Sequence, residues 1–119
     1  MGLRDRARRR LAAPVAELDR MRLSDRYTGL GVDKVCDLPL RQPCRLAGEV
    51  QGIRVVPRAG SPSLEVTVSD GSGRAVAVFL GRRRLPGVDV GRGVVLEGVA
   101  RKQGDRTMLL NPAYTLLPH

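Results

Sequence analysis

The chain has 119 residues, of which 42% are hydrophobic and only 3% are aromatic. This length allows one small domain with a short extension, and the composition excludes a disordered chain. No apolar run reaches the roughly 20 residues of a membrane span, and no apolar stretch follows the basic N-terminus as a signal peptide requires. We therefore expect a cytoplasmic protein that does not bind membranes and has a core of aliphatic side chains.

The chain is strongly basic, with 21 Lys and Arg residues against 12 Asp and Glu residues and a formal net charge of +9. Nearly all of the positive charge is Arg, whose planar guanidinium matches phosphate oxygens. A preference for Arg over Lys also arises from a GC-rich genome, so the composition alone carries little functional weight. The net charge indicates a polyanionic partner, and nucleic acid is the first candidate.

The reactive side chains do not form a recognisable catalytic or metal site. Cys36 and Cys44 have seven residues between them, and the one His is His119 at the end of the chain. A zinc site needs more ligands, so we expect two reduced thiols, no metal and no other cofactor. Asp70 and Asp105 lie in turn sequences, where Asp is favoured for backbone reasons. With no Ser/His/Asp or Cys/His grouping, we expect a protein that is not an enzyme.

Residues 1–43 are predicted to form an N-terminal helix and a linker. Apolar residues at helical spacing predict a helix from about Pro14 to about Arg26. Pro14 suits the first turn of a helix; if it only kinks the helix, the helix extends back through the Arg-rich residues 4–10. The Arg residues 8–10 are interpreted as a frayed basic arm, and the Gly- and Pro-containing residues 28–43 as a linker. The apolar helical positions are Leu11, Val15, Leu18 and Met21.

Residues 44–119 are predicted to form a β domain with strands at 44–57, 64–69, 74–80, 92–102 and 106–117. The apolar parity of the first strand switches at Gly52, which predicts a bulge or bend that lets one strand serve two sheets. The sequence DGSG at residues 70–73 predicts a hairpin turn, and Asn111 and Pro112 interrupt the last strand. These features favour a closed five-stranded barrel. An SH3-like barrel is the main alternative, but it usually has shorter strands and a more aromatic surface.

Three further motifs accompany this strand order: an apolar strand ending in Phe79, PGVDVG at residues 86–91, and NPAY at residues 111–114. Together with DGSG they resemble OB-fold nucleic-acid-binding domains of the tRNA-anticodon-binding type, and among these the wedge domain of RecG-type helicases. The segment LGRRRLPG and the helical N-terminus are similar to small stand-alone OB-fold proteins of actinobacteria. The resemblance covers about residues 44–118 and implies an all-β, five-stranded OB-fold Greek-key barrel. It does not imply helicase activity, because the chain has no GxxxxGK[ST] loop.

In OB domains the ligand lies across strands two and three, between the loop after strand one and the loop between strands four and five. Here those loops are residues 57–63 and 102–106. We expect weak binding of single-stranded DNA or RNA, or of junctions, without sequence specificity; the alternative is a solvated barrel with Arg-rich loops. The candidate nucleic-acid-binding residues are Arg54, Arg58, Arg74, Phe79, Arg82, Arg83, Arg84, Arg101, Lys102 and Arg106.

Two of these assignments have an explicit alternative. The residues Arg82–Arg84 either extend the groove or pair with Asp89 or other acids on the same rim. If Val76, Val78 and Leu80 point into the barrel, Phe79 lies on the outer face and can stack a base. If instead Phe79 points inward, its ring fills the core. The scarcity of large side chains favours the core.

A second function class is a protein-interaction or dimerisation module that uses the barrel and the N-terminal helix. Its predicted contact surface is the second face of the third strand, formed by Val76, Val78 and Leu80, if that face is exposed. The partner is then another protein or a second copy of the chain.

Overall fold

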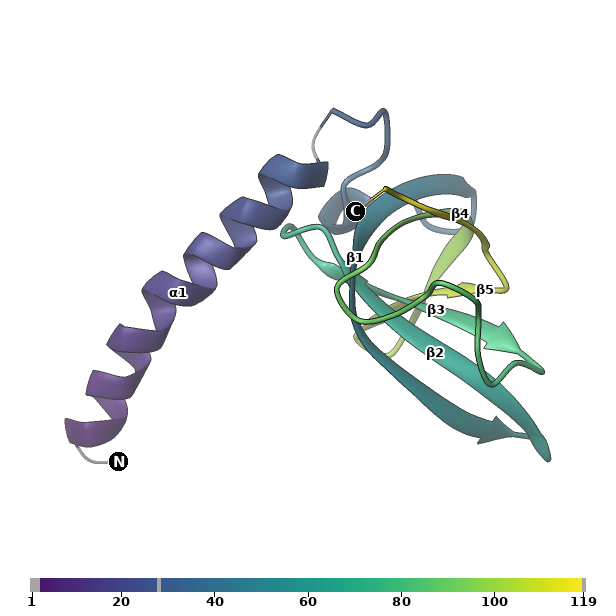
Figure 1. Cartoon of the computed structure of the whole chain (residues 1–119), viewed down its shortest axis with the longest axis horizontal. Coiled ribbons are helices and arrows are strands. Elements are labelled where there is room, and N and C mark those ends of the chain that lie inside the picture. Colours follow the sequence, from purple (N-terminus) through teal and green to yellow (C-terminus); the bar gives the residue numbers. More distant parts are fainter. Residues whose placement is uncertain (1–2, 28, 119) are drawn as a thin grey trace.

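The computed structural model of the protein describes residues 3–27 and 29–118, with side chains for residues 15–27 and 29–118. In this part of the chain a long helix, α1 (Leu3–Tyr27), and a short 3-10 helix, η1 (Val35–Asp37), precede a sheet (Figure 1). The predicted basic arm at residues 8–10 and the terminal His119 lie outside the described side chains. The strands are β1 (Pro43–Arg58), β2 (Ser61–Ser69), β3 (Arg74–Leu80), β4 (Gly93–Gln103), β5 (Arg106–Leu110) and β6 (Ala113–Leu116).

The sheet closes into a barrel. Its strand order is β1-β2-β3-β5-β4-β6, and β1 also pairs with β4, so that β1, β2, β3, β5 and β4 form a complete ring. The pairing of β3 with β5 is parallel, and the other pairings are antiparallel. Closure leaves little free strand edge, and this connectivity is that of the OB fold. The predicted all-β OB barrel with an N-terminal helix is confirmed.

β1 serves two neighbours because it bends in its middle. Its first half pairs with β4 from Pro43 to Glu49, and its second half pairs with β2 from Glu49 to Arg58. The register with β2 shifts between Val50 and Gly52, as the parity switch predicts. The bulge therefore turns the strand from one side of the barrel to the other.

The predicted loop at residues 57–63 is wrong. β1 and β2 stay paired through Pro57 and Pro62 to Arg58 and Ser61, which leaves a two-residue turn of Ala59 and Gly60. Both turn residues have positive φ, 49° and 80°, as in a type I′ hairpin. The two prolines face each other in the ladder, and the Pro62 carbonyl oxygen accepts a hydrogen bond from the Gly81 amide at 2.9 Å on the β3 side, so no proline N–H is needed between β1 and β2.

The last predicted strand is divided at Asn111 and Pro112 into β5 and β6. Asn111 has φ of 48°, and its Oδ1 accepts a hydrogen bond from the Leu80 amide at 2.9 Å. Pro112 follows with no N–H to donate to a ladder. After the interruption the chain continues along the same edge of β4: β5 pairs with the end of β4 from Ala100 to Gln103, and β6 pairs with its beginning from Val94 to Glu97.

The barrel core is aliphatic, as the composition predicts, and it contains Phe79. Ala75, Ala77 and Phe79 all belong to the core cluster, so this parity of β3 faces inward. The ring of Phe79 meets the half-buried ring of Tyr114 edge-on, with centroids 5.8 Å apart. The largest fully buried core residues include Leu46, Leu64, Leu96, Leu109, Val50, Val66, Val68 and Val94.

The D-G-S-G turn between β2 and β3 holds the linker against the barrel. Asp70 is buried, and its Oδ1 accepts hydrogen bonds from the Ser72 amide at 2.9 Å and from the Ser72 hydroxyl at 2.6 Å. Its Oδ2 accepts from the Val35 amide at 3.0 Å, and the Ser72 hydroxyl accepts from the Cys36 amide at 3.1 Å. The motif therefore caps its own turn and positions η1, which confirms a backbone role for Asp70.

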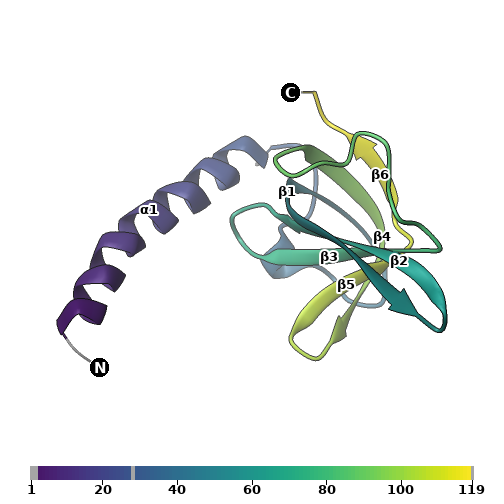
Figure 2. The ribbon, with the colours of Figure 1, turned by 60° about the horizontal axis from the view of Figure 1, so that its bottom comes forward.

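α1 packs on the barrel through its C-terminal turns. Leu23 and Tyr27 are buried in a small cluster with Ala47 and Val95, and Glu49 accepts hydrogen bonds from the guanidinium groups of two helix arginines at 3.3 Å each. Those arginines are Arg22 and Arg26. Toward its N-terminus the helix diverges from the barrel (Figures 1 and 2).

The helix is longer than the shorter of the two predicted versions, since it runs back through Pro14 to Leu3. Of its predicted apolar positions, Leu11 lies outside the described side chains, and the other three do not make the contact: Val15, Leu18 and Met21 are 68%, 65% and 53% exposed. Leu23 and Tyr27 do so instead, because they lie on a different side of the helix in the turns that reach the barrel. In the described ranges no helix has both the length and the apolar character to cross a membrane.

Candidate nucleic-acid interface

A groove of about 310 Å³ lies over the outer face of β2 and β3, beside the turn between β4 and β5. The face is the outer one because the alternate residues Leu64, Val66 and Val68 fill the core. The groove is open to solvent at the position where OB domains hold their ligands. Its lining residues are Arg54, Glu65, Thr67, Arg74, Val76, Asp105, Arg106 and Thr107.

Three guanidinium groups meet one carboxylate at this groove. Glu65 Oε1 accepts hydrogen bonds from Arg54 Nη2 at 3.1 Å and from Arg106 Nη2 at 3.0 Å, and Oε2 accepts one from Arg58 Nη2 at 3.3 Å. Arg54, Arg58 and Arg106 are here called the arginine cluster. Three positive charges against one negative charge leave a local net charge of +2.

Glu65 is buried beneath the arginines that it binds. The residue is 4% exposed, whereas the side chains of Arg54, Arg58 and Arg106 are 69%, 33% and 40% exposed. Burial by itself raises the pKa of Glu65, but hydrogen bonds from Arg54 and Arg58 and the charge of Arg106 lower this pKa by more. The net result is a pKa below the ordinary value, so Glu65 is ionised at neutral pH. The carboxylate thus keeps the three side chains on one face while their outer surfaces stay in contact with solvent.

Strand register explains how the cluster forms. Arg54 and Glu65 are direct partners in the β1–β2 ladder, so their side chains emerge on the same face. Arg58 is four residues further along β1 and shares this face, since side chains alternate along a strand. Arg106 is the first residue of β5, which runs parallel to β3, and its side chain reaches over β3 to Glu65.

Arg74, the first residue of β3, completes the positive lining of the groove. It is exposed, and no hydrogen bond or ion pair ties its side chain to another described residue. Of the ten predicted site residues, the structure therefore brings Arg54, Arg58, Arg74 and Arg106 together.

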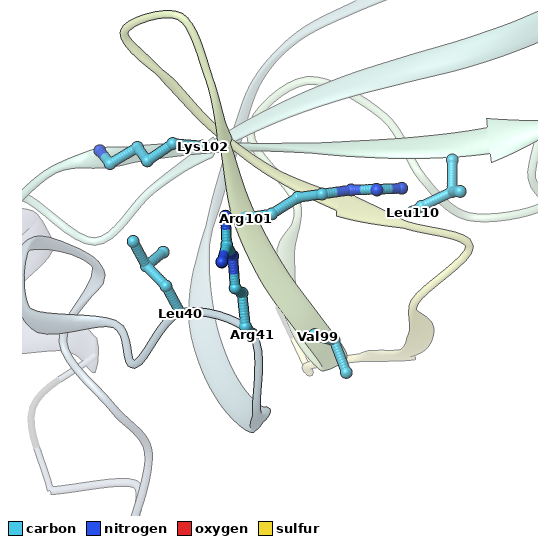
Figure 3. A pocket seen from close by; sticks show the side chains of 6 residues that line it. All are labelled: Leu40, Arg41, Val99, Arg101, Lys102 and Leu110. Atoms are coloured by element: carbon cyan, nitrogen blue, oxygen red, sulfur yellow. The ribbon is translucent and has the colours of Figure 1, made fainter.

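Arg101 and Lys102 contribute to a different surface. They line a pocket of about 590 Å³ together with Leu40, Arg41, Val99 and Leu110, which is here called the Arg41 pocket (Figure 3). Consecutive strand residues point to opposite sides, and in Figure 3 Arg101 extends toward Leu110 while Lys102 extends the other way. Lys102 Nζ donates a hydrogen bond to Thr107 Oγ1 at 2.8 Å, so Lys102 also borders the groove.

The residues Arg82–Arg84 lie outside both sites. All three are exposed in the connector between β3 and β4, and within the described chain none has an ion-pair or hydrogen-bond partner, Asp89 included. The connector itself is anchored after the triplet by Leu85 and Val88, which are buried in the core. Neither of the two predicted arrangements of this triplet is seen in the structure.

Phe79 is a correction to the predicted site. It is 7% exposed and belongs to the barrel core, because Ala75 and Ala77 on the same side of β3 are also buried there. Phe79 therefore does not present its ring to the groove.

The second face of β3 offers less apolar surface than the dimerisation hypothesis requires. Val78 is fully buried within the chain, Val76 is half-buried in the groove, and only Leu80 is exposed, at 44%. The expected patch of three exposed residues is absent from the described structure.

Two residues of these surfaces, Glu65 and Arg41, are not among the candidates predicted from the sequence. Apolar and polar residues alternate along residues 64–69, which indicates an outward Glu65, and the register of this strand with Arg54 is the signal that identifies their pairing. Arg41 carries no such signal, because its place beside β4 depends on a backbone contact between the linker and the barrel.

No protein-family model and no curated protein matches the chain. Among solved structures, it is similar to a chain of a replication protein A heterotrimer bound to single-stranded DNA. The TM-score is 0.51 and the sequence identity is 13%, and the alignment covers 83% of this chain and 78% of that chain. At this identity the likeness concerns the fold, and it agrees with the OB connectivity of the barrel.

Proposed function

We propose that the chain is a non-catalytic nucleic-acid-binding protein that holds single-stranded DNA or RNA, or the single strands of a junction, in the groove over β2 and β3. The observation that carries this proposal is the arginine cluster around Glu65, on the outer face of an OB barrel where ligands of this fold lie. Arg74 lines the same groove together with Arg54 and Arg106 of the cluster. Guanidinium groups recognise phosphate through paired hydrogen bonds, which fits a sugar–phosphate backbone.

The groove supports weak binding without base specificity. No aromatic side chain is among its lining residues, and Phe79 and Tyr114 pack against each other instead. Stacking on an aromatic ring is worth about 1–3 kcal/mol per base in such proteins, and this site lacks it. Affinity then comes mainly from phosphate contacts, so it falls steeply as salt increases. The anticodon-binding subtype and the kinship with RecG wedge domains stay predictions.

A binding titration tests this proposal. Fluorescence anisotropy is measured with labelled oligonucleotides of about 15 nucleotides, single- and double-stranded, in DNA and RNA form. Each titration is run at about 50 mM and about 200 mM salt. We expect binding of the single strands at low salt and a marked loss at high salt. If no oligonucleotide binds at low salt, the proposal is wrong.

Arg74→Glu locates the binding in the groove. Arg74 has no ion-pair partner among the described residues, so reversing its charge leaves the Glu65 hydrogen bonds intact. Arg83→Glu is the matched control, since it makes the same change of charge at an exposed position outside the groove. We expect Arg74→Glu to weaken binding about tenfold more than Arg83→Glu does. Equal losses would show that the net charge, not the groove, binds the oligonucleotide.

One observation favours the second function class, a homodimer formed through the helix. Val15, Leu18 and Met21 are exposed along α1, away from the barrel. Dimerisation would bury them against a second copy. Light scattering of the wild type and of Leu18→Glu distinguishes the cases: a dimer that Leu18→Glu converts to a monomer supports this function, and a monomeric wild type excludes it.

A further inference from the structure

The Arg41 pocket lies on β4 and the linker, and its amino acids differ from those of the groove. Its volume is about 590 Å³, nearly twice that of the groove. None of its six lining residues is shared with the groove. It is therefore a second surface, which adjoins the groove only through Lys102 and its hydrogen bond to Thr107.

The pocket carries three positive charges and no negative one. Arg41, Arg101 and Lys102 line it, and no Asp or Glu is among its lining residues. Within the described chain Arg41 and Arg101 have no carboxylate partner, in contrast to the arginine cluster with its buried Glu65. An uncompensated group of cations indicates an anionic occupant from outside the chain.

The walls of the pocket are aliphatic. Leu40 and Val99 are 41% and 50% exposed, and Leu110 is half-buried. Figure 3 shows these three side chains around Arg41 and Arg101 on the two sides of β4. Exposed aliphatic side chains beside cations provide an apolar contact that a phosphate or a sugar does not use.

The backbone at Arg41 is held in an unfavourable conformation. Its φ is 62°, in the left-handed region that residues other than Gly rarely adopt. The Arg41 amide donates a hydrogen bond to the Ala100 carbonyl at 2.8 Å, and Leu40 forms a β-bridge with Ala100. These contacts fix Arg41 beside β4, and such local strain is common at ligand-binding positions.

We propose that the Arg41 pocket binds an acidic segment of a partner protein that carries aliphatic side chains between its carboxylates. The carboxylates would pair with Arg41, Arg101 and Lys102, and the aliphatic side chains would cover Leu40, Val99 and Leu110. A peptide satisfies both the charged and the aliphatic part of the surface, whereas the phosphates and sugars of a nucleic acid would leave the aliphatic side chains uncovered. This inference does not depend on the proposed nucleic-acid function.

The test uses a fluorescein-labelled dodecapeptide in which Asp or Glu alternates with Leu, titrated with the full chain. One control peptide replaces each Leu by Ser, and another replaces each Asp and Glu by Asn and Gln. We expect both controls to bind at least about tenfold more weakly than the acidic, Leu-containing peptide. Binding of the Leu-free peptide with equal affinity would overturn the proposal, because charge alone would then explain it.

Three variants assign the binding to the pocket. Arg101→Glu removes a cation, Val99→Ser removes an aliphatic wall, and Arg84→Glu is the matched charge control outside the pocket. We expect the first two to weaken peptide binding about tenfold and Arg84→Glu to change it little. Should Arg101→Glu fail to fold, as judged by circular dichroism, Arg41→Gln replaces it.

The same variants are titrated with the single-stranded oligonucleotide used for the groove. If Arg101→Glu abolishes oligonucleotide binding and leaves peptide binding unchanged, the pocket belongs to a nucleic-acid surface and the peptide proposal is wrong. If Arg101→Glu weakens peptide binding and leaves oligonucleotide binding unchanged, the pocket is a separate peptide site.

Discussion

Arg106 Nη2 lies 3.0 Å from Glu65 Oε1, although 41 residues separate the two in the sequence. The contact crosses the barrel from the start of β5 to the middle of β2, over the intervening strand β3. It joins the third guanidinium to a carboxylate that already binds Arg54 and Arg58. Glu65 therefore determines both the position and the net charge of the arginine cluster.

Replacing Glu65 by Gln should strengthen oligonucleotide binding. The substitution keeps a hydrogen-bond acceptor but removes the negative charge, so the local net charge rises from +2 to +3. A phosphate then no longer competes with an ionised carboxylate for the guanidinium groups. We expect the affinity at low salt to rise about two- to tenfold and its salt dependence to become steeper, measured by anisotropy. Weaker binding with an intact fold would mean that the carboxylate is needed to position the arginines.

The same residue should make stability depend on pH. The folded-state pKa of Glu65 lies below its ordinary value, so ionised Glu65 stabilises the fold above that ordinary value, and the contribution disappears as pH falls through the folded-state pKa. Urea unfolding of the wild type and of Glu65→Gln, at about pH 7 and about pH 3, measures this. The wild type should be more stable than the variant at neutral pH, and the difference should shrink in acid. A difference that is constant with pH would contradict the assigned pKa shift.

Gly71→Ala should detach α1 from the barrel. Gly71 has φ of +88°, and a Cβ there would overlap the Arg20 carbonyl oxygen and lie 2.9 Å from the Ser24 amide nitrogen. Because both atoms belong to the helix backbone, a side-chain movement cannot relieve the overlap. We expect limited proteolysis to cut faster within residues 15–27. The hydrogen-exchange rates of the barrel amides should change little. Gly104→Ala, with positive φ but open space, is the control for backbone strain alone.

Tyr27→Phe should stabilise the helix contact or leave it unchanged. The Tyr27 hydroxyl is buried and has no hydrogen-bond partner among the described residues, and burial raises the pKa of Tyr27. An unpaired buried polar group costs about 1–3 kcal/mol, and the substitution removes it while the ring stays in contact with Leu23, Ala47 and Val95. Thermal unfolding measures the effect. A loss of more than about 1 kcal/mol would show that the hydroxyl has a partner.

Phe79→Leu should lower the free energy of unfolding and leave oligonucleotide binding unchanged. Phe79 fills the barrel core and its ring contacts that of Tyr114. Replacing the ring leaves a partial cavity and removes the edge-on contact, at a cost of about 1–3 kcal/mol. Urea unfolding measures the loss, and anisotropy at a temperature where the variant is folded measures binding. If the folded variant binds the oligonucleotide more weakly, Phe79 contributes to the binding site after all.

Much of the barrel could be predicted because its signals are local. The alternation at residues 64–69, the D-G-S-G turn, the parity switch at Gly52 and the break at Asn111 each depend on a few neighbouring residues. Their outcomes are the strand β2, the tight turn before β3, the bulge in β1 and the split between β5 and β6. The same local reasoning failed at residues 57–63, where two prolines indicated a loop and the strands continue to a type I′ turn.

The site depended on contacts that span the chain. By itself, the sequence determined the fold class, the turn at residues 70–73 and the abundance of arginine, since alternation and turn chemistry act over a few residues. Only the tertiary structure decided which arginines converge, that Glu65 is buried beneath three of them, and that Arg41 joins Arg101 beside β4. The physical reason is that closing the barrel brings together residues as far apart in the sequence as Pro43 and Val99, and burial and charge pairing exist only after closure.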